Sequence, residues 1–242
     1  MKLFNLDSPV MQALSKMADL MWLNVLTLIC CIPIVTVGAS LTAMHYMALK
    51  IVRNEECYIT RSFFKSFKEN FKQGTVIWLI MLAVLLVLVG DFFIMKYSGL
   101  EFNKALQIII IAIGVLYLFT VMFVFPVLAK FDNTIRRTIK NAFLMSIMQF
   151  PKTILMVIMF AIPPVVFVLY PQAIPVVFLF GLSVPAWLSA KLYNKFFQKL
   201  EDQILEANAP AEESQEDGEQ GEDERIFKDE LDESLMGDNP VR

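Results

Sequence analysis

Four long apolar segments divide the first 190 residues of the chain. Residues 20–49 carry no charge, residues 75–95 carry only Asp91, and residues 105–129 and 153–190 are again uncharged. About 20 apolar residues cross the hydrocarbon core of a bilayer as a helix. The second and third segments therefore predict one transmembrane helix each.

The fourth segment is too long for one passage. Its 38 residues would form a helix of roughly 57 Å, nearly twice the core thickness. The sequence YPQAIP near its middle, at residues 170–175, favours a helix end and a turn. We predict a hairpin of two spans over 153–170 and 173–190.

The first segment has several interpretations. A cleaved signal peptide is one, because VGAS at 37–40 resembles a cleavage site, but the spans that follow make cleavage unnecessary for membrane insertion. The simplest prediction is one span over 20–45 that bends at Pro33, is loosened at Gly38 and continues partly at the interface. A re-entrant or double passage remains open.

These patterns together predict an all-α, polytopic transmembrane helix bundle with about five spans, six being possible. The composition agrees, since 57% of the residues are hydrophobic, more than the roughly 45–50% of soluble domains. We expect a membrane domain over residues 1–200 and a separate tail over residues 201–242.

Positive charge is concentrated in alternate connecting segments. Residues 1–200 hold 18 lysines and arginines against 8 acids, and most of the bases lie in 50–74, 130–152 and 191–199. The positive-inside rule places these three segments in the cytoplasm. With five spans the N-terminus lies outside, and with six it lies inside.

Two of the basic segments are amphipathic. Phe63, Phe67 and Phe71 fall within an arc of about 80° on a helix, with Lys65, Lys68 and Lys72 on another side. This pattern predicts a helix in the headgroup layer of an anionic inner leaflet, or a docking helix for a partner membrane protein. Residues 130–152 repeat it less regularly, with Arg136, Arg137 and Lys140.

A few residues within the apolar segments are candidates for a functional role. Asp91 is the only acid within a predicted span and is a candidate for a proton or solute role, but its place near the outer end favours an interfacial carboxylate near Lys96. His45 is the only histidine and is expected to bond a neighbouring helix. Further candidate helix breaks, of the kind that line solute sites in transporters, are Pro163, Pro164 and Pro185.

The sequence contains none of the common catalytic motifs that we sought. The sequence holds no phosphate-binding glycine loop, no G-x-S-x-G and no H-E-x-x-H, and its three cysteines form no C-x-x-C pair. We therefore expect no enzyme, no cofactor, no metal site and no nucleic-acid partner.

The tail is strongly acidic, with 16 acids and three bases after residue 200. Such a composition predicts disorder. One short segment, Arg225–Met236, alternates apolar and acidic residues and is a candidate for folding against a partner.

The segment PIVTVG at 33–38, FFKSFKENFKQ at 63–73 and KFDNTIRRTIKNAF at 130–143 resemble the YesL family, small integral membrane proteins of Gram-positive bacteria. The resemblance implies a multi-pass protein of the cell membrane, often encoded beside sugar-uptake ABC transporters, without an established activity. We therefore predict an accessory or assembly partner of a membrane complex such as a sugar-uptake ABC system. The alternative is a small transporter or channel for a sugar or ion.

Overall fold

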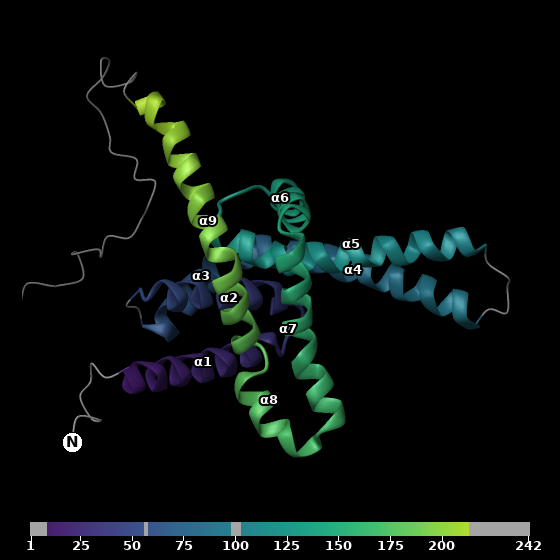
Figure 1. The fold of residues 1–242 in the computed structure, drawn as a ribbon, viewed down its shortest axis with the longest axis horizontal. Helices are drawn as coiled ribbons and strands as arrows, with labels where there is room; N and C mark the ends of the chain where they lie inside the picture. Colours follow the sequence, from purple (N-terminus) through teal and green to yellow (C-terminus); the bar gives the residue numbers. More distant parts are fainter. Residues whose placement is uncertain (1–8, 56–57, 98–102, 213–242) are drawn as a thin grey trace, which may run out of the picture. The chain divides into compact units, whose positions relative to one another are not determined.

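The computed structural model describes residues 9–55, 58–97 and 103–212, and these residues are helical apart from short connections. The predicted all-α fold is confirmed. The helices are α1 (Pro9–Cys31), η1 (Ile34–Thr36), α2 (Val37–Arg53), α3 (Ile59–Glu69), α4 (Phe71–Tyr97), α5 (Lys104–Lys130), α6 (Ile135–Met148), α7 (Phe150–Leu169), η2 (Pro171–Ala173), α8 (Ile174–Phe180) and α9 (Ser183–Glu212) (Figure 1).

The chain groups into two units, residues 1–197 and 198–242. The first contains α1 to α8 and the N-terminal half of α9. Helix α9 continues to Glu212, so residues 201–212 are helical where a disordered tail was expected. The Arg225–Met236 segment lies outside the described residues.

Within the described ranges, five helical segments are long and apolar enough to cross a membrane, namely α1, η1 with α2, α4, α5 and α7. The segment of η2 and α8 joins α9 at a bend of 52° and makes a sixth candidate. The predicted count of about five spans, with six possible, agrees with these helices.

The first apolar segment differs from our simplest prediction. A single bent span over 20–45 is wrong, because the chain breaks between Cys31 and Ile34 and returns as a second helix. Ser40 Oγ donates to the carbonyl of Thr27 at 3.0 Å, and Lys16 Nζ donates to Asn54 Oδ1 at 2.6 Å. The first bond joins the end of α1 to the start of α2, and the second joins the start of α1 to the end of α2, so the two helices form an antiparallel hairpin.

Helix α2 is the centre of the packing. It contacts α1, α3, α4 and α5, and 61% of its segment is buried against 11% for α4. Its buried residues are mostly small or polar, including Gly38, Ala39, Ser40 and Ala43. In a bilayer, small residues allow helices to approach closely, whereas the most apolar faces remain toward lipid.

Of the residues predicted to break helices, one lies in a connection and the others lie within helices. The connection between α1 and η1 contains Pro33, as expected, but Gly38 lies inside α2. Helix α7 runs through Pro163 and Pro164, and Pro185 occupies the first turn of α9, where a missing N–H costs little. The actual break before α9 is at Gly181 and Leu182.

Candidate functional site

The helix break between α8 and α9 is held by one buried side chain of α1. Asn24 Nδ2 donates to the carbonyl of Phe178 at 2.7 Å, and Asn24 Oδ1 accepts from the N–H groups of Leu182 and Ser183, each at 2.9 Å. Broken helices at membrane depth need such partners, since lipid offers none. Asn24 thus satisfies three backbone groups that the break would otherwise leave unpaired.

A second polar contact joins α2 to α9. His45 and Tyr193 are buried, and Tyr193 Oη lies 3.4 Å from His45 Nδ1. The Phe160 ring of α7 approaches His45 with 6.1 Å between ring centres. Near the end of α2, Arg53 Nε donates to Asn194 Oδ1 at 2.9 Å. His45 therefore bonds a neighbouring helix, as the sequence predicted.

No cluster of three or more histidine, cysteine, aspartate or glutamate side chains occurs in the part of the chain that the structure describes. The Asn24 and His45 contacts connect helices that are far apart in sequence, so their chemistry here is hydrogen bonding between helices.

The predicted amphipathic helix over residues 63–73 is divided into two. Helix α3 ends at Glu69, so Phe71 and Lys72 belong to the first turn of α4. Phe63 is fully buried within the chain and stacks on Phe67, with 6.3 Å between ring centres. Phe63 is therefore buried by the protein itself rather than exposed at a membrane surface, and α3 as a whole contacts α1, α2 and α4.

The basic residues of both amphipathic helices are exposed, as a surface role requires. On α3 and the start of α4 they are Lys65, Lys68 and Lys72, and on α6 they are Arg136, Arg137 and Lys140. Helix α6 turns Thr138, Ala142 and Met145 inward, and it packs on α5.

Asp91 lies partly exposed in the last two turns of α4. The ammonium group of Lys96 lies 5.6 Å from the centre of the Tyr97 ring. Among residues 9–55, 58–97 and 103–212, no basic side chain forms an ion pair with Asp91. A solute or proton role for this carboxylate stays a prediction.

Asn24 and Tyr193 were missed by the sequence reasoning. Asn24 did carry a signal, because it is the only amide side chain in the uncharged segment 20–49. A polar side chain inside a predicted span is, like an acid, a candidate for a specific contact or a functional role. Tyr193 had no comparable signal, since it lies between Lys191 and Lys195, after the uncharged segment 153–190 rather than inside it.

Comparisons with known proteins bear on the family resemblance. Residues 20–92 match a family described as "Protein of unknown function, DUF624". The "Uncharacterized protein YesL" of Bacillus subtilis (strain 168) is 26% identical over 103 residues, which are 43% of this chain and 48% of that protein. The predicted YesL resemblance is confirmed.

The chain thus spans about half the length of the curated YesL relative that it matches. The DUF624 match runs from the middle of α1 through most of α4, and includes Asn24, the central helix α2 and the amphipathic helix α3. No solved structure matches the chain significantly.

Proposed function

We propose that this YesL-like chain is an accessory or assembly partner of a membrane protein complex in the cell membrane, with its basic helices on the cytoplasmic face. The observation that carries the proposal is the arrangement of α3 and α6. Both expose basic side chains, and both adjoin the same end of the hairpin of α4 and α5.

The connectivity supports this arrangement. Helices α4 and α5 lie side by side (Figure 1). Helix α3 leads into α4, and α6 follows α5, so the two basic helices flank the open end of one hairpin. Tyr117 Oη donates to the carbonyl of Met81 at 2.9 Å and ties the two long helices together. One end of the hairpin therefore presents positive charge, which favours anionic lipid headgroups or an acidic partner.

The remainder of the hairpin is apolar and exposed. Buried residues of α4 end at Met81, and those of α5 begin at Phe119. Beyond them, side chains such as Leu86, Val87, Phe93 and Ile108 are more than half exposed. Apolar faces beside a charged end fit packing in a bilayer against lipid or against the helices of a partner.

Sugar-uptake ABC transporters are the partner class that the family resemblance favours. Capture of the tagged full chain in mild detergent tests this, with one membrane protein expected at a stoichiometric amount. Reversing the exposed charge of α6 (Arg136→Glu, Arg137→Glu and Lys140→Glu) should release that partner. The matched control keeps the charge (Arg136→Lys, Arg137→Lys and Lys140→Arg) and should retain it.

Two outcomes would contradict the proposal. One is capture of no stoichiometric membrane partner. The other is a partner that remains bound to the charge-reversed chain, which would remove the basic face of α6 from the interaction.

A small transporter or channel is the second candidate, because the 52° bend before α9 resembles the broken helices of solute sites. The backbone groups at this break are already bonded by Asn24, which favours the accessory role. Flux of sugars or ions through reconstituted protein, reduced by Asp91→Asn, would support transport instead.

A further inference from the structure

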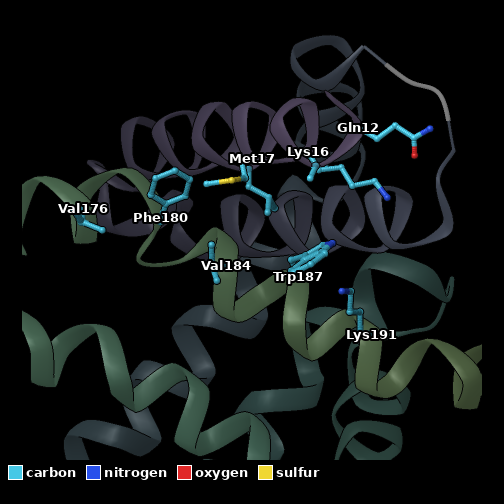
Figure 2. A pocket seen from close by; sticks show the side chains of 10 residues that line it. Gln12, Lys16, Met17, Val176, Phe180, Val184, Trp187 and Lys191 are labelled. Carbon is cyan, nitrogen blue, oxygen red and sulfur yellow. The ribbon is translucent and has the colours of Figure 1, made fainter. Parts of the chain in front are cut away.

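A groove of about 670 Å³ lies between α1 and the segment formed by α8 and α9 (Figure 2). This volume is typical of small-molecule sites, which span roughly 300–1,000 Å³. Its apolar walls are formed by Met17, Leu20, Val176, Phe180 and Val184. On α1 and on α9 the lining positions recur every three or four residues, so each helix gives one continuous face.

One end of the groove is polar and positively charged. Lys16 and Lys191 lie at the same end as the indole N–H of Trp187, while Val176 and Phe180 lie at the other (Figure 2). The ammonium of Lys191 lies 3.5 Å from the centre of the Trp187 ring. Trp187 Nε1 is buried and has no hydrogen-bond partner among the described residues.

The two lysines have no carboxylate partner in the described part of the chain. Lys16 bonds the neutral amide of Asn54, and Lys191 lies over an aromatic ring. Two ammonium groups at one end of the groove, with an unpaired N–H at the same end, favour a bound anion.

The position of the lysines is consistent with a lipid headgroup. Asn54 directly follows Arg53, which bonds Asn194 on α9, so the polar end of the groove lies near the basic end of α2. Within α9, the chain advances by roughly 10 Å from Val184 to Lys191 at about 1.5 Å per residue, and Val176 and Phe180 of α8 extend the apolar wall beyond the bend. An acyl chain can extend along such an apolar wall while its headgroup stays at the lysines.

We propose that this groove binds one anionic phospholipid, with its phosphate between Lys16 and Lys191 and an acyl chain along Met17, Leu20, Val184 and Phe180. The site is independent of the accessory role. The occupant is a lipid rather than a soluble phosphate because the long apolar part of the groove would contribute nothing to binding a small anion.

Native mass spectrometry of the full chain in neutral detergent tests the proposal, with phosphatidylglycerol and phosphatidylcholine of identical acyl chains as probes. We expect one phosphatidylglycerol to stay bound preferentially. A lysine near anionic lipid is worth roughly a 5-fold change in affinity, so Lys16→Gln with Lys191→Gln should weaken the binding of phosphatidylglycerol about 30-fold. Soluble glycerophosphate should not displace the lipid.

Lys195→Gln is the matched control, since it removes the same charge from an exposed position of α9 outside the groove. It should leave phosphatidylglycerol bound. Val184→Trp fills the apolar part and should weaken both phospholipids while both lysines remain. Equal binding of the two phospholipids by the unaltered chain, or an equal loss in Lys195→Gln, would overturn the proposal.

A photo-crosslinker at position 184 identifies the occupant directly. An adduct with the mass of one phospholipid supports the proposal. A crosslink to the acidic residues after 200, or to a second copy of the chain, would assign the groove to a protein segment and overturn it.

Discussion

At the scale of the residue, Asn24 shows how one side chain can stabilise a helix break. Its amide pairs with a carbonyl and two N–H groups of the connection between α8 and α9, 154 to 159 residues away. The break can lie within an apolar segment because the Asn24 side chain, rather than water, pairs with these backbone groups.

Asn24→Leu keeps the approximate volume of the side chain but removes all three bonds. A buried polar group left unpaired costs about 1–3 kcal/mol, so we expect a clearly lower thermal unfolding midpoint in detergent. Thr27→Val is the control, because Thr27 Oγ1 is also buried on α1 but bonds only the Leu23 carbonyl of its own helix. Equal midpoints for the two variants would contradict this role of Asn24.

At the scale of the element, α2 and α4 cross at two glycines. A β-carbon added to Gly38 would overlap the carbonyl oxygen of Gly74 and lie 2.6 Å from Trp78 Cβ. A β-carbon on Gly74 would lie 3.0 Å from the backbone of Ala39. The crossing therefore requires Gly38, and a residue that we expected to loosen a helix instead lets two helices touch.

Gly38→Ala should destabilise the protein even though alanine favours helices. Overpacking of this kind costs about 1–3 kcal/mol, which a shift of the unfolding midpoint in detergent would measure. Gly90→Ala and Gly114→Ala are matched controls on α4 and α5, because nothing lies within 4 Å of either added β-carbon. They should be neutral or gain up to about 1 kcal/mol. A Gly38→Ala chain as stable as these controls would show that the crossing adapts without cost.

The sequence was sufficient to predict the long apolar helices, but not which side chains of the amphipathic helices are buried. The long apolar segments correspond to α4, α5 and α7, because lipid demands the length and hydropathy that the sequence displays. Phe63 was expected in the headgroup layer and is buried against the chain itself. A helical stripe of aromatic residues gives the same pattern whether it faces lipid or protein, so periodicity could not separate the two.

At the scale of the whole molecule, the fold is a set of antiparallel hairpins joined by amphipathic helices. Helices α1 and α2 form one, and α4 and α5 form another. The sequence alone did not decide how many times residues 20–49 cross the membrane, because 30 uncharged residues are more than one span needs and fewer than two spans need. The structure has two helices here, because α1 begins at Pro9, before the uncharged segment, and α2 ends at Arg53, after it. The charged flanks thus join the helices, which a count of uncharged residues could not reveal.

The first hairpin predicts that the N-terminus lies on the same side of the membrane as α3, since Lys16 near the start of α1 bonds Asn54 at the end of α2. Single cysteines at Ser8, Ser62, Asn103 and Gln172, in a chain without Cys30, Cys31 and Cys57, test this in intact cells. An impermeant thiol reagent should label positions 103 and 172, and should reach 8 and 62 only after permeabilisation. The positive-inside rule gives the direction, because α3 carries exposed bases.

The pattern of labelling separates the possible errors. Label at position 8 but not at 62 in intact cells would mean that α1 and α2 together cross only once. Label at 62 but not at 103 would reverse the orientation and place the basic helices outside, where cytoplasmic components of an uptake system cannot reach them. Protection of 8 and 62 together would exclude a single crossing by α1 and α2, because an antiparallel hairpin returns the chain to the side on which it began.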